Sequence, residues 1–313
     1  MPATMVSTPR RLSGGASRET WAVDVRIGDR TGDTVGLVYR GQFGEQKLAA
    51  SLREEHLAMT ALYQAGQPVP RPYPAPSETG DMAFMVMERA AGVDLRKAMS
   101  TLSESVRSAL RVQLMNSLVR IHGIDADRVF PYRGGYEYNV DSQLHQWILP
   151  ILADDTAIDV PLLKAAARRL DAFRPADGPV CLLHGDFKAN NILVEGGRMT
   201  AILDWELCHV GDPLEDLAWT RLWTTRWDVI GGLFDSQEFL DQYANSSGTE
   251  IDPERFAYWE LFSWVKLAMI LRRQGQEAQE AGSSPMLAQL GRSVAHCEVH
   301  IAARLGAIEG ATS

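Results

Sequence analysis

Residues 180–207 read VCLLHGDFKANNILVEGGRMTAILDWEL, a stretch in which short apolar runs alternate with polar and glycine-rich segments. Apolar runs of this length, bounded by Gly, Asn and Asp, are typical of short β-strands. Strands are therefore predicted at Val180–His184, Asn191–Val194 and Met199–Leu203. The turn Glu195–Arg198 is predicted to join the second and third strands into a hairpin.

The register of this hairpin decides which polar side chains meet. We expect Val194 to pair with Met199 across the turn, so that Asn191 lies opposite Ile202. Asn191 and Asp204 then share one face of the hairpin as diagonal neighbours, with Cα atoms roughly 7–8 Å apart. An amide oxygen and a carboxylate oxygen at that spacing are suited to bind one hard cation. A slip of one residue would place them on opposite faces.

Phosphoryl transfer needs the groups that this stretch contains. A carboxylate must orient or deprotonate the attacking hydroxyl, and one or two Mg²⁺ ions must neutralise the phosphates. Asp186 stands in the loop directly before the hairpin, so its carboxylate can face the expected Asn191/Asp204 metal site. This layout is typical of the catalytic loop and the metal-binding aspartate of kinases.

Three segments resemble one known family. His184-Gly185-Asp186-Phe187-Lys188-Ala189-Asn190-Asn191 resembles the catalytic loop of aminoglycoside phosphotransferases and of related small-molecule kinases such as choline kinases. Ile202-Leu203-Asp204-Trp205-Glu206 is similar to their metal-binding segment, and Gly211–Ala218 to the motif that follows it. The resemblance extends more loosely from about Leu12 to the C-terminal helices. It implies a two-lobed, protein-kinase-like α+β fold that uses ATP and Mg²⁺.

The resemblance also implies roles for individual residues. Asp186 matches the catalytic base, Asn191 a Mg²⁺ ligand, and Asp204 the main Mg²⁺ ligand, which bridges the phosphates of ATP. Each of these residues taken singly would have turn capping as its default explanation, but their order and spacing favour the catalytic one. His184 is expected to hold the loop by hydrogen bonds rather than to move protons.

The N-terminal part contains the residues expected to bind the nucleotide. Arg40 matches the basic residue that holds the phosphates, and Glu55 its ion-pair partner, although Glu54 is adjacent. Glu88 and Ala90 lie in the segment that resembles the hinge, whose backbone binds adenine. A small-residue turn occupies the place of the loop that covers the phosphates, and its backbone N–H groups are suited to bind phosphate oxygens. This loop consists of Ser13, Gly14, Gly15, Ala16 and Ser17.

The distribution of predicted elements divides the chain into residues 1–91, a small β-rich nucleotide-binding lobe, and residues 92–313, a larger helical lobe for catalysis and substrate binding. In the first part, β-branched and aromatic runs predict strands, and an approximate helical period predicts a helix. The strands are Thr20–Ile27, Val35–Arg40 and Ala83–Glu88, and the helix is Leu48–Tyr63.

Helices dominate the second part. Thr101-Leu102-Ser103-Glu104 has the spacing of a capping box and predicts a helix to about His122. Asp159-Val160-Pro161 predicts the start of another helix, and long helices are predicted at Arg255–Arg273 and Ser284–Leu305. Asp212 and Pro213 are expected to be a helix N-cap and first-turn proline, a structural role.

Composition excludes several classes of function. The 313 residues contain 31 Lys and Arg against 40 Asp and Glu, a net charge of −9, which argues against nucleic-acid binding. Apolar runs are too short to cross a membrane, and the N-terminus lacks the pattern of a secretory signal. The three cysteines fit a reducing compartment, so a cytoplasmic location is expected. Oligomeric state is not readable from the sequence.

We therefore expect an ATP- and Mg²⁺-dependent kinase that phosphorylates a hydroxyl of a small molecule. Trp205-Glu206 follows Asp204 where protein kinases have Phe-Gly, and no Ala-Pro-Glu occurs downstream, which disfavours a protein kinase. The sequence around Asp204 is most similar to the branch of kinase domains fused to acyl-CoA dehydrogenases, which favours a metabolic acceptor. The alternative is a nucleotide-binding pseudokinase with a sensing or scaffolding role. Acidic candidates for binding a cationic acceptor, each with a structural explanation as alternative, are Asp154, Asp155, Glu215 and Glu260.

Overall fold

A computed structural model of the chain describes residues 3–12, 18–28, 32–43, 50–74, 77–79, 82–130, 140–153, 161–175, 178–222, 228–280, 282 and 284–311. The chain divides into two compact units, each built from three separate stretches. Unit 1 contains Met1–Tyr136, Cys181–Val210 and Trp223–Thr249, and unit 2 contains Glu137–Val180, Gly211–Leu222 and Glu250–Ser313. The lobe boundary expected between residues 91 and 92 stays a prediction.

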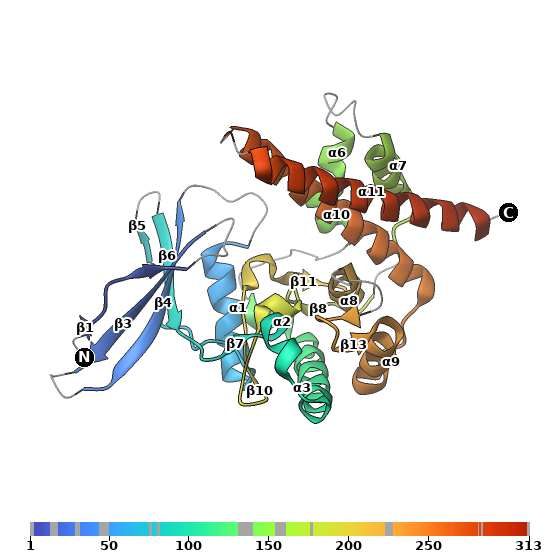
Figure 1. Ribbon diagram of the computed structural model, residues 1–313. Coiled ribbons are helices and arrows are strands. Elements are labelled where there is room, and N and C mark those ends of the chain that lie inside the picture. The colour runs from blue at the N-terminus through green and yellow to red at the C-terminus, as the bar shows by residue number, and fades with distance from the viewer. Residues whose placement is uncertain are drawn as a thin grey trace. The chain divides into compact units, whose positions relative to one another are not determined.

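Unit 1 begins with an antiparallel sheet in the order β1-β3-β4-β6-β5, in which β2 also pairs with β3 (Figure 1). The strands predicted in this part of the chain are present, each extended by one to four residues. The bounds are β1 (Ala3–Met5), β2 (Arg10–Arg11), β3 (Glu19–Ile27), β4 (Thr34–Phe43), β5 (Ser77–Thr79) and β6 (Met82–Glu88).

Helix α1 (Leu52–Gln64) follows β4 and carries a capping box. Ser51 accepts a hydrogen bond from the N–H of Glu54, and the Glu54 carboxylate accepts one from the N–H of Ser51. The apolar period that predicted this helix is its buried face, which includes Leu52, Met59 and Leu62. The same face buries Glu55, a charged residue whose partners are described below.

The remainder of unit 1 combines short strands with helices α3 and α9. Strand β9 lies between β10 and β7 in one small sheet, and β8/β11 and β12/β13 form two-stranded sheets. The bounds are β7 (Val93–Asp94), α2 (Leu95–Ala98), η1 (Met99–Thr101), α3 (Glu104–His122), α4 (Ala126–Val129), β8 (Cys181–Leu183), η3 (Ala189–Asn191), β9 (Ile192–Glu195), β10 (Arg198–Ile202), η4 (Trp205–Leu207), β11 (His209–Gly211), β12 (Asp228–Val229), β13 (Phe234–Asp235) and α9 (Ser236–Ser247).

The N-cap of α3 differs from the prediction. Ser103, not Thr101, is the N-cap, and its side chain accepts from the N–H of Val106. Thr101 belongs to the 3₁₀ turn η1, and its hydroxyl donates to the carbonyl oxygen of Ala98 (2.8 Å). Thr101, which the sequence pattern assigned to the start of the helix, therefore belongs to the preceding turn and uses its hydroxyl there. The end of the helix at His122 was predicted correctly.

The hairpin register was predicted correctly at its turn and wrongly beyond it. Met199 pairs with Val194 as expected, but a bulge at Thr200 then shifts the register by one residue. Two residues of β10 oppose one of β9 there, as in any β-bulge, and the Thr200 hydroxyl donates to the carbonyl oxygen of Ala91 (2.6 Å). Leu203, not Ile202, consequently lies opposite Asn191 and donates its N–H to the Asn191 carbonyl (2.7 Å).

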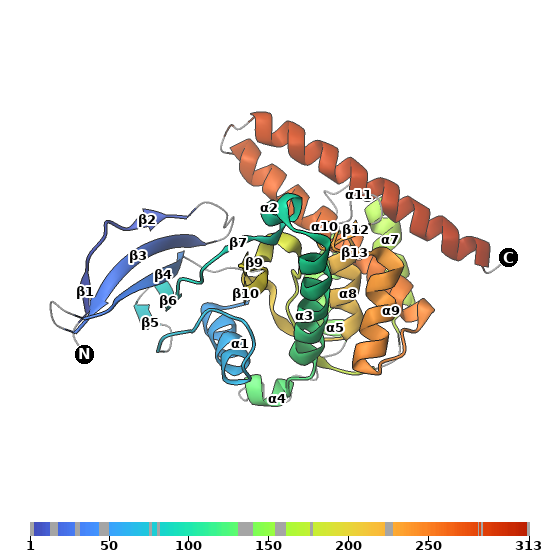
Figure 2. The ribbon, with the colours of Figure 1, turned by 60° about the horizontal axis from the view of Figure 1, so that its bottom comes forward.

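Unit 2 is helical. Helix α10 packs against α7, α8 and α11, and Figures 1 and 2 both show α10 and α11 side by side. Both helices were predicted, and both extend further than expected. The bounds are α5 (Val140–Gln143), η2 (a π-helix, Leu144–Ile148), α6 (Leu149–Ala153), α7 (Pro161–Ala172), α8 (Pro213–Leu222), α10 (Pro253–Glu280) and α11 (Ser284–Ala311).

None of the helices in the described ranges combines the length and the apolar character that a membrane span requires. The cytoplasmic location expected from the sequence stays a prediction.

Candidate active site

The loop from His184 to Asn191 connects β8 to β9, and Gly185 determines its path. Gly185 has φ +78°, a left-handed conformation that L side chains rarely adopt. A Cβ atom at this position would lie 2.2 Å from the carbonyl oxygen of Leu207. The loop therefore packs directly against η4, the turn that follows Asp204, and only glycine permits this approach.

His184 connects the loop to the end of the hairpin. The backbone N–H of Asp186 donates to its Nδ1 (3.1 Å), so the ring proton must be on Nε2, which donates to the carbonyl oxygen of Leu203 (2.9 Å). The side chain is fully buried, and its ring lies 4.4 Å from that of Trp205. The expectation that His184 holds the loop by hydrogen bonds is confirmed.

Asp186 is buried and surrounded by donors. The Asn191 side-chain amide donates to its Oδ2 (3.0 Å) and to its backbone oxygen (2.9 Å), and Lys188 Nζ lies 2.7 Å from the same Oδ2. Lys188 was not singled out from the sequence. It has extended backbone two residues after Asp186, a spacing that places both side chains on the same side of the segment and could have revealed the pair.

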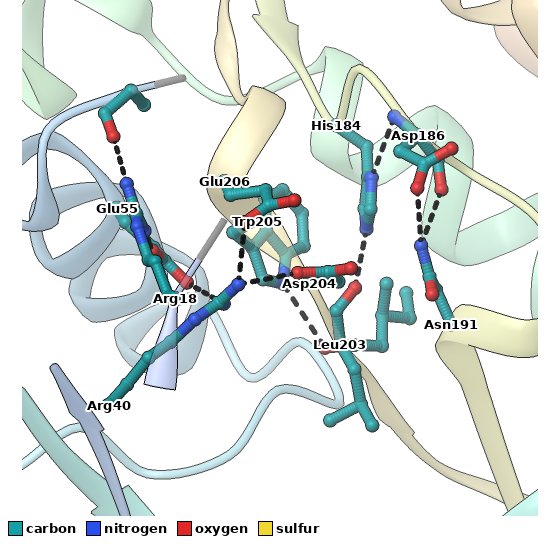
Figure 3. Close-up of polar contacts among 12 residues, drawn as sticks. Arg18, Arg40, Glu55, His184, Asp186, Asn191, Leu203, Asp204, Trp205 and Glu206 are labelled. Atoms are coloured by element: carbon teal, nitrogen blue, oxygen red, sulfur yellow. Dashed lines mark hydrogen bonds and ion pairs between the residues drawn. The ribbon is translucent and has the colours of Figure 1, made fainter. Parts of the chain in front are cut away.

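Asp204 occupies a strained position at the end of β10. Its backbone is left-handed (φ 67°, ψ 60°), which is uncommon for a residue other than glycine and is often found at functional sites. Its side chain is 30% exposed, and Oδ1 accepts a hydrogen bond from Arg40 Nη2 (2.7 Å). Figure 3 shows this carboxylate beside the guanidinium of Arg40.

Arg40, on β4, contacts three carboxylates (Figure 3). Its Nη1 donates to Glu55 Oε1 (2.5 Å), and its Nη2 donates to Asp204 and to Glu206 Oε2 (2.9 Å). Burial by itself would lower the pKa of Arg40, but attraction by the three carboxylates outweighs burial and raises this pKa above its ordinary value. The three carboxylates therefore stabilise the charged form of the guanidinium.

Two members of this cluster were missed in the sequence. Arg18 is buried and donates to Glu55 Oε2 and to the carbonyl oxygen of Ala50. Glu206 lies two residues after Asp204, and its backbone oxygen accepts from the N–H of Ala50 (2.7 Å). Arg18 directly follows the predicted phosphate loop, whose sequence does not indicate a role for this side chain. Glu206 could have been identified, because it is an acid two residues after the predicted metal ligand Asp204. The partner of Arg40 is Glu55, while Glu54 serves the α1 cap.

Residues far apart in the sequence line one cavity of about 330 Å³ in unit 1. It contains six of the residues singled out from the sequence: Arg40, Glu55, Glu88, Ala90, Asn191 and Asp204. Asp186 does not line it but bonds to Asn191, which does. The predicted phosphate loop, Ser13, Gly14, Gly15, Ala16 and Ser17, lies outside the described residues. Apolar residues that complete the wall are Leu12, Val38, Met59, Pro70, Met87, Leu193, Leu203 and Trp205.

Two oxygen donors line this cavity, Asn191 and Asp204. The prediction that they share one face of the hairpin is wrong, because the bulge shifts the register by one residue. Asp204 lies beyond the end of the strand, where its backbone is left-handed, and it lines the same cavity as Asn191.

Asn191 uses its amide nitrogen on Asp186, so its amide oxygen points away from that carboxylate (Figure 3). Asp204 supplies a partly exposed carboxylate. Within the described ranges, no group of three or more His, Cys, Asp and Glu residues is placed to hold a metal ion. The chemistry of an amide oxygen and a carboxylate oxygen fits Mg²⁺, which commonly takes one or two protein oxygens and completes its shell with water and phosphate.

In unit 2, Asp212 has the expected capping role. It accepts hydrogen bonds from Leu214 N–H (3.0 Å), Trp259 Nε1 (2.6 Å) and Arg255 Nε (2.5 Å), and α8 begins at Pro213. Burial raises the pKa of Asp212, although these donors and the charge of Arg255 oppose the rise.

The acidic candidates for an acceptor site in unit 2 are paired where they are described. Glu215 lies 3.2 Å from Lys266 Nζ and is buried with it. Glu260 accepts from Arg221 (3.2 Å) and Arg304 (3.4 Å). Asp154 and Asp155 lie outside the described residues. The ion pairs of Glu215 and Glu260 favour structural roles for these two acids.

Several proteins contain a region similar to this chain. Mouse acyl-CoA dehydrogenase family member 10 is 26% identical over 247 residues, which are 72% of this chain and 22% of that protein. Rat acyl-CoA dehydrogenase family member 11 is 29% identical over 245 residues, 71% of this chain and 31% of that protein. The chain thus spans less than a third of the length of these relatives.

Solved structures share the fold. A Ralstonia eutropha protein assigned to the aminoglycoside phosphotransferases has a TM-score of 0.74 at 19% identity, covering 98% of this chain and 94% of that chain. The GDP and kanamycin complex of aminoglycoside phosphotransferase APH(2'')-IIIa has a TM-score of 0.64 at 14% identity, covering 95% and 94%. The expected kinase-like α+β fold is confirmed.

The sequence profile of the phosphotransferase enzyme family matches residues 8–259, more than half of the chain. This match and the shared fold confirm the expected family and the expectation of a small-molecule kinase. The chain belongs to the phosphotransferase enzyme family.

Proposed function

We propose that this chain transfers the γ-phosphoryl group of ATP to a hydroxyl of a small molecule, with Mg²⁺ as cofactor and Asp186 as catalytic base. The observation that carries the proposal is the convergence of Arg40, Glu55, Asn191 and Asp204 on one cavity, next to Asp186. These residues come from separate segments and supply the cation, the oxygen ligands and the carboxylate that phosphoryl transfer needs.

The cavity supports nucleotide binding. Its apolar lining includes Val38, Met87 and Leu193, a surface suited to the two faces of a nucleobase. The hinge residues Glu88 and Ala90 lie at the same wall, and no partner for the N–H of Ala90 is found in the described part of the chain. That N–H can donate to a base nitrogen. A similar structure, that of APH(4)-Ia with a TM-score of 0.58, is a complex with ADP and hygromycin B, which supports nucleotide binding as a function of this fold.

Arg40 would hold the phosphates. It lines the cavity, and its guanidinium is held in the charged form by the neighbouring carboxylates. Asn191 and Asp204 would hold Mg²⁺, which when bound neutralises charge on the transferring phosphate.

Asp186 would accept the proton of the acceptor hydroxyl. Asn191 and the backbone bond to His184 fix its orientation, so little reorganisation is needed when the hydroxyl arrives. Lys188 Nζ lies 2.7 Å from the Asp186 carboxylate and adds a further contact that holds it in place.

The acceptor is proposed only by class. Kanamycin and hygromycin B are present in complexes of similar structures, and the similar regions of acyl-CoA dehydrogenase family members suggest a metabolic hydroxyl compound. A screen that measures ADP release should therefore include aminoglycosides, choline and hydroxyacyl-CoA compounds. We expect ADP release with at least one hydroxyl acceptor and formation of its phosphate ester. ATP binding without transfer to any acceptor would contradict catalysis and favour the pseudokinase alternative.

A further inference from the structure

The guanidinium of Arg40 contacts more carboxylates than the proposed reaction requires. One carboxylate, Glu55, is enough to fix it, and a second, Asp204, is the proposed metal ligand. The third, Glu206, accepts from the same Nη2 that donates to Asp204 (2.9 and 2.7 Å). The two hydrogens of this one nitrogen are thus divided between Asp204 and Glu206.

Glu206 is held in place independently of Asp204. Glu206 belongs to the 3₁₀ turn η4. Its backbone oxygen accepts a hydrogen bond from the N–H of Ala50, which lies just before α1. Asp204 precedes this turn with a left-handed backbone, and its side chain is the more exposed of the two, 30% against 20%. A ligand in the cavity can therefore draw Asp204 away from Arg40 while Glu206 remains where it is.

The charges of the cluster show why it matters that Arg40 Nη2 bonds to both Asp204 and Glu206. Arg18 and Arg40 carry two positive charges, and Glu55, Asp204 and Glu206 carry three negative charges. A metal bound by Asp204 would compete with Arg40 for this carboxylate, whose Oδ1 accepts the hydrogen bond from Nη2. With Glu206 present, Arg40 keeps a partner on Nη2 and stays at the cavity wall. Without Glu206, Asp204 would be the only acid on that nitrogen and would be harder to detach.

We propose that Glu206 is a positioning residue that holds Arg40 at the phosphate wall and thereby frees Asp204 for the metal. This inference rests on the proposed nucleotide site. It assigns to Glu206 a role exerted through Arg40, and it differs from two simpler roles: a structural contact within η4, or direct metal ligation by Glu206.

The test measures the dissociation constant of ATP by calorimetry with excess EDTA and again with Mg²⁺. The ratio of the two constants, the magnesium gain, is the readout. In Glu206→Gln we expect the magnesium gain to fall by roughly threefold to tenfold, the size expected for one charge removed from a partly buried cluster. Glu195→Gln, the same change at an exposed site in β9 outside the cavity, should leave the gain unchanged.

A double-mutant cycle with Arg40→Met separates the three roles. If Glu206 acts through Arg40, most of the effect of Glu206→Gln on the magnesium gain disappears in the Arg40→Met background. A gain that falls equally in both backgrounds would overturn the inference in favour of direct ligation. Equal weakening of ATP binding with and without Mg²⁺, together with a lower melting temperature, would overturn it in favour of a structural contact.

Failure of the proposed function gives a different result. If the unmodified chain bound ATP under neither condition, the nucleotide site itself would be wrong and the inference would fall with it. If the unmodified chain shows a magnesium gain that Glu206→Gln leaves unchanged, only the inference is wrong.

Discussion

Units 1 and 2 each contain a buried cluster of charge, and the two clusters differ in what surrounds the cation. In unit 1, Arg40 shares its guanidinium among three carboxylates, two of them partly exposed, and lines a cavity. In unit 2, Lys266 pairs with Glu215, both 3% exposed, and its Nζ lies 5.1 Å from the ring centres of Trp147 and Trp219.

The difference separates a cation that lines the described cavity from one that does not. Aromatic rings and a single carboxylate enclose Lys266, and neither Lys266 nor Glu215 belongs to the described cavity lining. Arg40 instead lines the cavity of unit 1. Burial and ion pairing alone therefore do not identify a functional residue, whereas a neighbouring cavity does.

The largest expected effect is on stability, at the enclosed cluster. Lys266→Met should lower the free energy of unfolding by about 3–5 kcal/mol, because it removes the buried cation that pairs with the Glu215 carboxylate. Urea denaturation measures the change. ATP affinity of the folded variant should stay at the unmodified value.

The matched control for this prediction removes both charges. Lys266→Met combined with Glu215→Leu should recover most of the lost stability, since an apolar pair of similar volume often replaces a buried ion pair without loss. If the double variant were no more stable than Lys266→Met, the loss would come from packing rather than from the lost ion pair.

The second effect is on turnover. Asp186→Asn should lower kcat by a factor on the order of 10² or more, because the amide cannot accept the hydroxyl proton, while ATP affinity changes little. Steady-state ADP release and calorimetry give the two numbers. Asp241→Asn, an exposed change in α9, is the control. Near-normal kcat in Asp186→Asn would show that another group is the base.

A smaller effect is expected at the open cluster. Arg40→Met should weaken ATP binding roughly tenfold or more, the loss of a charged hydrogen bond to phosphate. Its cost in stability should be below that of Lys266→Met, because water can solvate the partly exposed Asp204 and Glu206 once the arginine is gone. Calorimetry gives the ATP affinity of Arg40→Met and Lys266→Met, and urea denaturation gives their free energies of unfolding. A loss of stability in Arg40→Met as large as that in Lys266→Met would contradict the difference between the two clusters.

The smallest effect is a pH dependence in unit 2. His300 stacks on Trp264, and burial, with the charges of His296 and Arg304, lowers its pKa below the ordinary 6.5, while Glu260 partly opposes this. As pH falls, His300 therefore binds its proton at a higher pH in the unfolded chain than in the folded protein. The stability that neutral His300 contributes is present above pH 6.5 and is lost as pH falls through its folded pKa. Between pH 7.5 and 5, the free energy of unfolding, measured by urea denaturation, should depend less steeply on pH in His300→Gln than in the unmodified chain. An unchanged slope would contradict this role of His300.

Sequence reasoning predicted the local elements well where one face is buried. The apolar periods of α1 and α10 and the run that forms β6 appear where expected, because burial requires those patterns. The capping of α8 by Asp212 also followed from local chemistry. The ends of helices and the apolar runs that form strands depend on residues that are close in the sequence, so the sequence alone can predict them.

What the sequence could not reveal depends on contacts between distant segments. The bulge at Thr200 accompanies a hydrogen bond to Ala91, and nothing in the alternation of β10 marks it. Arg18 directly follows the predicted phosphate loop, but nothing in that loop's sequence indicates that its side chain shares Glu55 with Arg40. The division of Arg40 between Asp204 and Glu206 requires that β4 and η4 be adjacent in space, which only the folded chain shows.

The most direct test of the account is the effect of Mg²⁺ on ATP binding at the cavity of unit 1. Calorimetric titration with ATP should show tighter binding with Mg²⁺ than with EDTA in the unmodified chain, and Asp204→Asn should abolish this difference. A variant that retained the full difference would contradict the assignment of the metal to Asp204, and a chain that bound no ATP would contradict the site as a whole.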